Sequence, residues 1–159
     1  MTECVIVALG SNLGDSEKNL SAVIERLAAF AAGDLQASSF FRTAPVDCPP
    51  GSPDFLNAVV AFEARDGLTP EALLTELQAL EQEFGRQPKK VMNEARPLDL
   101  DIVAFGMEVR EDPKLTIPHP RAGERRFVLA PLAEILPDFR APGWSANASE
   151  MLRCLPTAR

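Results

Sequence analysis

The stretch RPLDLDIVAFG, residues 96–106, has the alternation of a β-strand, yet it places two acids among apolar residues. Residues two apart on a strand share a face, so Asp99 and Asp101 point the same way, with Cβ atoms roughly 6.6–7 Å apart. Val103 and Phe105 are expected to follow on that face. The opposite face is expected to be apolar and to consist of Leu98, Leu100, Ile102 and Ala104. The acids are therefore predicted to lie where a covered strand opens into a cleft.

Two carboxylates in such a position repel each other unless a cation neutralises them. Oxygen ligands suit a hard divalent cation, and Mg²⁺ fits the pair if a phosphate completes its coordination shell. The preceding segment, residues 85–96, holds one acid, Glu94, and four basic residues, Arg86, Lys89, Lys90 and Arg96. Acids for Mg²⁺ and arginines for phosphate oxygens are what phosphoryl transfer requires. The alternatives are a strand whose polar residues face water and an ordinary solvated loop.

Composition limits the class of protein. The chain has 159 residues, which predicts one domain over residues 1–159, and its formal net charge of -7 disfavours binding to nucleic acid or to an anionic membrane. No apolar run is long enough to span a bilayer, and the first residues lack the pattern of a signal peptide. Three widely spaced cysteines predict free thiols in a cytoplasmic protein.

The remaining elements predict an α+β fold. The apolar residues 4–9 predict a central strand, and the spacing of Leu20, Val23, Ile24, Leu27 and Ala31 predicts a helix capped by Asp15 or Ser16. Further strands are predicted at residues 35–43, 56–64 and 108–109, and further helices at residues 70–84, 126–136 and 148–155. This order predicts a ferredoxin-like βαββαβ core with an antiparallel sheet, helices on the faces and a C-terminal helical extension.

Three other features are candidates for binding. Phe55 and Asn57 share a strand face and are suited to clamp and read a flat heterocycle, or else they are a core aromatic and a strand-end amide. His119, the only histidine, is either structural or, with nearby arginines, a nucleotide contact. The GSNLGD turn lacks the pattern of a phosphate loop, although Gly10 would let a planar ligand approach the backbone.

Several segments resemble, in order and over most of the chain, the 6-hydroxymethyl-7,8-dihydropterin pyrophosphokinases of folate biosynthesis. They are ALGSNLGD, SSFFRTAPV, FLNAVVAFE, LEQEFGR, RPLDLDIVAFG and IPHPRAGERRFVLAPLAEILP. The resemblance implies transfer of pyrophosphate from ATP to 6-hydroxymethyl-7,8-dihydropterin, which gives the pterin diphosphate and AMP. We also expect the protein to be a monomer in the cytoplasm. A non-catalytic ferredoxin-like module that binds nucleotide or pterin is the alternative.

The resemblance also implies roles for single residues. Asp99 and Asp101 would bind two Mg²⁺ ions together with ATP, and Arg86 and Arg96 would be catalytic. The implied pterin-binding residues are Thr43, Ala44, Val46, Phe55, Asn57 and Phe127. The implied ATP-binding residues are Gln78, Glu81, Arg86, Lys89, Arg96, Ile102, Leu115, Thr116, His119 and Arg125. The chain departs from the family at residues 93–95, where Asn-Glu-Ala replaces the usual Trp-Gly-Pro.

Overall fold

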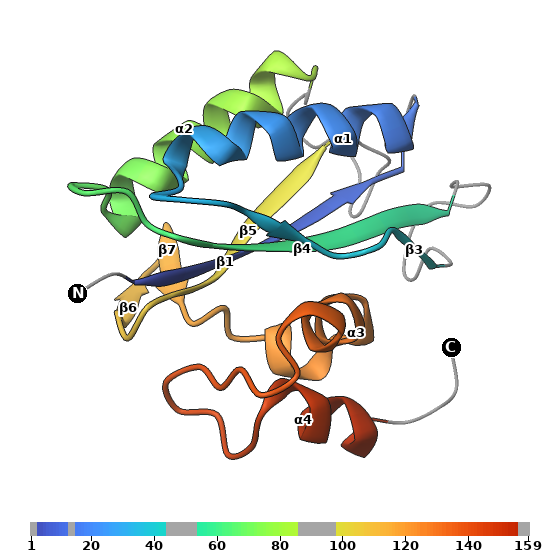
Figure 1. Cartoon of the computed structure of the whole chain (residues 1–159), viewed down its shortest axis with the longest axis vertical. Helices are drawn as coiled ribbons and strands as arrows, with labels where there is room; N and C mark the ends of the chain where they lie inside the picture. The colour runs from blue at the N-terminus through green and yellow to red at the C-terminus, as the bar shows by residue number, and fades with distance from the viewer. Residues whose placement is uncertain (1–2, 13–14, 44–53, 86–97, 156–159) are drawn as a thin grey trace.

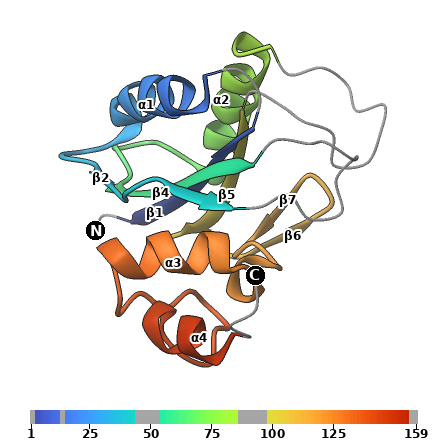
Figure 2. The same ribbon diagram turned by 90° about the vertical axis from the view of Figure 1, so that its right-hand side faces the viewer.

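The computed structural model describes residues 3–12, 15–43, 54–85 and 98–155. Its main feature is an antiparallel sheet with helices on both faces (Figures 1 and 2). The strands are β1 (Cys4–Ser11), β2 (Gln36–Ala37), β3 (Phe41–Thr43), β4 (Phe55–Glu63), β5 (Asp99–Phe105), β6 (Arg110–Asp112) and β7 (Leu115–Ile117). The helices are α1 (Ser16–Leu27), α2 (Pro70–Glu83), α3 (Arg126–Ile135) and α4 (Ala148–Cys154), with short 3-10 turns at Ala28–Phe30 and Ala122–Glu124.

The strand order confirms the predicted ferredoxin-like plan. The sheet runs β2-β4-β1-β5, with β3 also paired to β4, so the central strand β1 lies between β4 and β5. Helix α1 joins β1 to β2 and helix α2 joins β4 to β5, each crossing over one intervening strand. Strands β6 and β7 form a separate hairpin that contacts β5.

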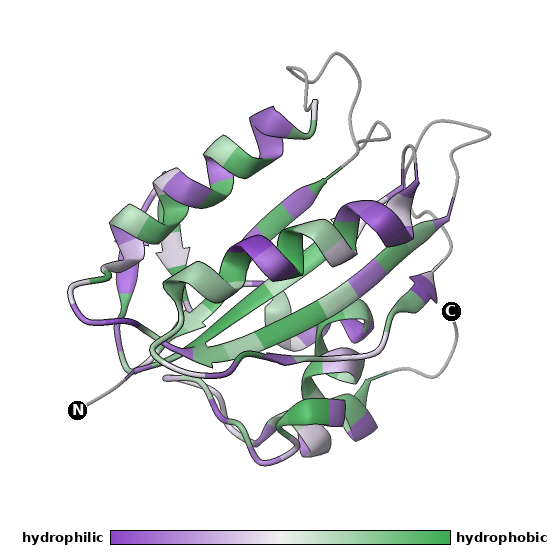
Figure 3. Ribbon diagram, turned by 45° about the horizontal axis from the view of Figure 1, so that its top comes forward, coloured by the Kyte–Doolittle hydropathy of each residue, from purple (hydrophilic) through white to green (hydrophobic). Residues whose placement is uncertain are grey.

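One face of the sheet packs against α1 and α2 (Figure 1). Apolar residues run along the strands, and the two helices alternate apolar and polar segments (Figure 3). The buried residues from β1, α1 and α2 are Val5, Val7, Leu9, Leu20, Val23, Leu27, Leu73, Leu77 and Leu80. Both helices begin at the predicted caps, because Asp15 accepts a hydrogen bond from the Lys18 amide and Thr69 accepts one from the Ala72 amide.

The other face packs against α3, with α4 outside it (Figure 2). Its buried residues include Ile6, Val59, Ala61, Val103, Val128 and Leu132. Helix α4 begins with a capping box between Asn147 and Glu150. No helix among the described residues is long and apolar enough to cross a membrane.

The single strand predicted at residues 35–43 is wrong, because the chain forms two short strands there. Ala37 pairs with Val60 but Phe41 pairs with Asn57, so one extra residue is inserted between them. The Ser38 side chain accounts for the break, because its hydroxyl accepts a hydrogen bond from the Val59 amide at 3.0 Å. A serine that bonds to the backbone in this way competes with the regular ladder.

The predicted faces of β5 are wrong at its C-terminal end. The pairing of β1 with β5 shifts between Ile6 and Val7, so one extra residue of β5 forms a bulge. As a result Val103 and Ala104 both face α3, whereas Phe105 turns into the core beneath α1 and α2. Phe105 therefore does not share the face of the acids, and Ala104 does not lie opposite them.

Two further boundaries differ from the prediction. The strand predicted at residues 108–109 lies instead at β6, because the Glu108 amide donates to the Phe105 carbonyl in a turn through Gly106, which has a φ of 55°. Strand β7 was not predicted. Helix α1 ends at Leu27, so Ala31 lies beyond it, where it packs against the core after a 3-10 turn.

Candidate active site

Three strands place polar groups in one row across the face of the sheet that packs against α3. Gly10 of β1 pairs with Asn57 of β4 on one side and with Asp99 of β5 on the other. In the adjacent row Ala8 pairs with Val59 and with Asp101. Neighbouring strands lie roughly 4.8 Å apart, so Asn57 and the two acids border the same few residues of β1.

Asp99 and Asp101 are both half-buried, and the residues on either side of them are buried. This partial exposure fits the predicted position at the mouth of a cleft. Two carboxylates on one face provide the hard oxygen donors that Mg²⁺ prefers. Within the described part of the chain, no third histidine, cysteine or acid joins them in a metal-binding group. The donor set therefore fits a cation whose remaining ligands come from a substrate or from water.

His119 lies close enough to Asp99 for their charges to interact. Its backbone amide donates to the carbonyl of Val103, the residue at the bulge of β5, at 2.8 Å. The ring accepts a hydrogen bond at Nδ1 from the Arg121 amide, which leaves Nε2 to carry the proton of the neutral ring. Burial lowers the pKa of His119, the positive charges of Arg125 and Arg121 lower it further, and the negative charge of Asp99 opposes them. The ring is therefore neutral at pH 7 and lies near Asp99.

Asn57 is held by strand β3. Its Nδ2 donates to the Thr43 hydroxyl at 2.8 Å and more weakly to the Phe41 carbonyl at 3.4 Å. A carbonyl can only accept, so this contact fixes which end of the amide faces β3. The amide oxygen consequently points toward the space over Gly10. The half-buried Phe55 lies two residues before Asn57 on the same strand face.

Phe127 stands at the beginning of α3 and is 38% exposed. The Arg125 guanidinium lies over its ring, 5.4 Å from the ring centre. A residue expected to bind ATP is thus in contact with one expected to bind the pterin. An exposed ring on the α3 side of the sheet is suited to stack on a flat ligand.

A second group of predicted residues lies at the outer edge of β5, near α2 and β7. Buried Glu81 accepts a hydrogen bond from the Leu100 amide at 2.8 Å. Leu100 stands between the two acids, and β5 is the last strand of the sheet. Glu81 therefore satisfies a backbone donor at a sheet edge and fixes the strand that carries the acids. Sequence reasoning missed this role, because nothing in the sequence pairs Glu81 with Leu100.

The other residues of this group differ in exposure. The Ile102 and Leu115 side chains are buried in the core beneath α1 and α2, so they are not available to a ligand. Gln78 and Thr116 are exposed. The structure thus divides the predicted ATP-binding residues into an edge group and the pair His119 and Arg125 near the acids.

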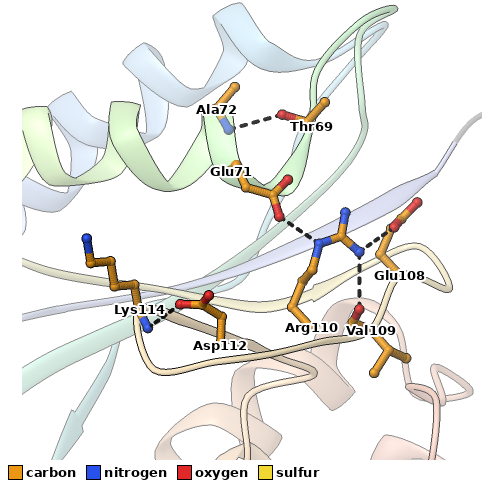
Figure 4. Close-up of polar contacts among 8 residues, drawn as sticks. All are labelled: Thr69, Glu71, Ala72, Glu108, Val109, Arg110, Asp112 and Lys114. Carbon is orange, nitrogen blue, oxygen red and sulfur yellow. Dashed lines mark hydrogen bonds and ion pairs between the residues drawn. The ribbon is translucent and has the colours of Figure 1, made fainter.

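The β6–β7 hairpin, which carries Leu115 and Thr116, is tied to α2 (Figure 4). Arg110 donates through Nε to Glu71 at 2.6 Å and through Nη1 to Glu108 at 2.7 Å. Both acids raise the pKa of Arg110, and its hydrogen bond lowers the pKa of Glu71. The contact joins the hairpin to the beginning of the helix that holds Gln78 and Glu81.

Five predicted site residues lie outside the described part of the chain. They are Ala44, Val46, Arg86, Lys89 and Arg96.

Comparison with known proteins supports the resemblance found in the sequence. The family described as 7,8-dihydro-6-hydroxymethylpterin-pyrophosphokinase (HPPK) matches residues 6–137. Proteins named 2-amino-4-hydroxy-6-hydroxymethyldihydropteridine pyrophosphokinase are 41% identical in Synechocystis sp., over 86% of this chain and 68% of that one, and 39% identical in Haemophilus influenzae, over 86% and 83%. In Pseudomonas aeruginosa the identity is 36%, over 98% of this chain and 94% of the relative.

Solved structures agree on the fold. A Plasmodium falciparum HPPK-DHPS crystallised with pterin and p-hydrobenzoate superimposes with a TM-score of 0.70 at 13% identity, over 96% of this chain and 44% of that one. This chain therefore spans less than half of that two-part protein, and the likeness shows the fold alone. The shared fold agrees with the sequence match over residues 6–137, which identifies the family. The chain belongs to the 7,8-dihydro-6-hydroxymethylpterin-pyrophosphokinase family.

Proposed function

We propose that residues 1–159 form a single domain that transfers pyrophosphate from ATP to 6-hydroxymethyl-7,8-dihydropterin in the presence of Mg²⁺ and releases AMP. Pyrophosphate transfer in folate biosynthesis is the activity of the family to which the chain belongs. The observation that carries the residue assignments is the row of Asn57, Gly10 and Asp99, with Asp101 in the next row. It brings a group that can read a heterocycle next to a pair of carboxylates.

The residues of the chain bind and orient the reactants. Asn57 offers its amide oxygen to a donor on the pterin ring, because β3 already engages its nitrogen. Phe55 and Phe127 stack on the two faces of the ring, with Thr43, Ala44 and Val46 at its edge. This arrangement points the hydroxymethyl group of the pterin toward the carboxylates, which is the main catalytic contribution that positioning can make.

Asp99 and Asp101 would hold two Mg²⁺ ions. When bound, these ions neutralise the phosphate oxygens of ATP and stabilise charge that develops during transfer. Arg86 and Arg96 bind the phosphates and act as catalytic residues, and Lys89 adds a further positive charge. His119 and Arg125 contact the nucleotide near the acids, whereas Gln78, Glu81, Thr116 and the backbones of Ile102 and Leu115 form the adenosine side. The domain acts as a monomer in the cytoplasm.

The test is to identify the nucleotide product. Purified protein incubated with ATP, Mg²⁺ and 6-hydroxymethyl-7,8-dihydropterin should yield AMP and the pterin diphosphate in equal amounts on chromatography. Release of ADP would instead indicate transfer of a single phosphoryl group. Binding of both ligands with no new product would support the non-catalytic alternative, which family membership disfavours.

The metal assignment has its own variant. Asp101→Asn removes one carboxylate charge and keeps the shape of the side chain, so kcat should fall by roughly 10²-fold or more, the loss typical of one electrostatic contact to a transition state. Pterin affinity in the absence of nucleotide should be unchanged. Asp34→Ala, at an exposed acid outside the site, is the matched control. A wild-type rate in Asp101→Asn would refute the assignment.

A further inference from the structure

The side chains of strand β1 become smaller along the face that carries the site. On that face they decrease in the order Ile6, Ala8, Gly10, whereas on the opposite face Val7 and Leu9, the neighbours of Ala8 and Gly10, are large and buried. Helix α3 packs against the end that holds Ile6. The central strand thus has no side chain on this face at Gly10, which lies beyond the part covered by α3 and pairs with Asn57 and Asp99.

The backbone does not require a glycine at position 10. Among the described residues, the glycines with a left-handed backbone are Gly67, Gly85, Gly106 and Gly143, and Gly10 is not one of them. Gly10 lies inside a regular antiparallel ladder with partners on both sides. A glycine inside a strand lowers stability relative to alanine and often marks a place where a ligand approaches the backbone closely.

The described structure also has room for a methyl group there. A Cβ atom at Gly10 would lie 3.4 Å from Asn57 Oδ1 and 3.9 Å from Phe55 Cδ1, and no other described atom beyond its chain neighbours would be within 4 Å. These are ordinary van der Waals distances. By contrast, a Cβ at Gly106 would lie 2.7 Å from the Glu3 side chain. Packing among the described residues therefore explains the glycine at 106 but not the glycine at 10.

We propose that Gly10 forms the floor of the pterin site. Its missing side chain lets the edge of the flat ring, whose two faces stack on Phe55 and Phe127, come directly against β1 between Asn57 and Asp99. The two atoms that a Cβ would touch belong to the residues assigned to reading and stacking on the pterin. A methyl group would lift the ring away from the Asn57 amide. This inference rests on the proposed function, and it makes Gly10 a residue that determines which ligand fits.

Calorimetry on Gly10→Ala tests the inference. The titrant is 6-hydroxymethylpterin, and the protein is saturated with α,β-methylene-ATP and Mg²⁺. We expect the affinity for the pterin to fall at least tenfold, the affinity for the ATP analogue to stay within about twofold of wild type, and the thermal midpoint to stay equal or to rise. Gly33→Ala is the matched control, because Gly33 has no positive φ and a Cβ there would meet nothing within 4 Å.

Each other outcome is decisive. Wild-type pterin affinity in Gly10→Ala, or a loss of nucleotide affinity with the pterin unaffected, would overturn the assignment of the floor. Failure of Gly10→Ala to fold would overturn it as well, because the glycine would then be needed for the fold itself. Failure of the wild-type protein to bind the pterin would instead count against the proposed function.

Discussion

The two faces of the sheet are built from the same strands but have different roles. On the face beneath α1 and α2, alternate residues of β1 stay large and buried from Val5 through Val7 to Leu9. On the face toward α3, the same strand passes from Ile6 to Gly10. The first face is mainly apolar and buried. The second ends in the row of Asn57, Gly10 and Asp99, which we assign to ligands.

This difference indicates where stability and function can be changed separately. A side chain on the packed face contributes mainly through the apolar surface that it buries. A side chain on the open part of the other face contributes little to the core and is positioned by specific hydrogen bonds, such as the contact between Asn57 and Thr43. Substitutions on the first face should therefore alter stability, and substitutions on the second should alter binding.

The largest expected change in stability comes from the packed face. Leu20 of α1 is fully buried, so Leu20→Ala should lower the free energy of unfolding by about 2–5 kcal/mol through lost burial and a residual cavity. Urea denaturation measures this change, and KM for both substrates should stay at the wild-type value. Glu25→Ala, at an exposed position of the same helix, should change stability by no more than about 0.5 kcal/mol. A raised pterin KM in Leu20→Ala would show that the two faces are not separable.

Much of this division could be predicted from the sequence. The spacing of apolar residues in α1 and α2, and the caps at Asp15 and Thr69, follow from local rules, and the structure confirms them. The strand pattern supplied the acid pair and the family resemblance added most of the other candidate residues, and the structure brings Asp99 and His119 close together. The bulge at Val103 could not be predicted, because it depends on the register between β1 and β5. The same holds for the split between β2 and β3, which depends on the contact of Ser38 with β4.

An intermediate effect is expected at Glu81, where the edge of β5 meets α2. Replacing Glu81 by leucine leaves the Leu100 amide without this acceptor, which should cost about 1–3 kcal/mol of stability. Because Leu100 stands between the two carboxylates, the Mg²⁺ concentration needed for half-maximal activity should also rise. Glu81→Gln retains an oxygen that can accept the bond and should lose less on both measures. Equal losses in the two variants would mean that the charge of Glu81, and not its hydrogen bond, is what matters.

The smallest effect concerns the charge state of the open face. His119 is the only histidine, so its ring gives an unambiguous NMR signal. In protein freed of metal with chelator, its pKa should lie below the usual 6.5, because burial and the charge of Arg125 outweigh Asp99. Arg125→Met should raise this pKa, and Asp99→Asn should lower it further. The folded protein then binds fewer protons at this site than the unfolded chain, so stability should decline as the pH falls from about 6.5 to the folded pKa. His119→Gln should flatten that slope, and a pKa above 6.5 in the wild type would contradict the electrostatic account of this face.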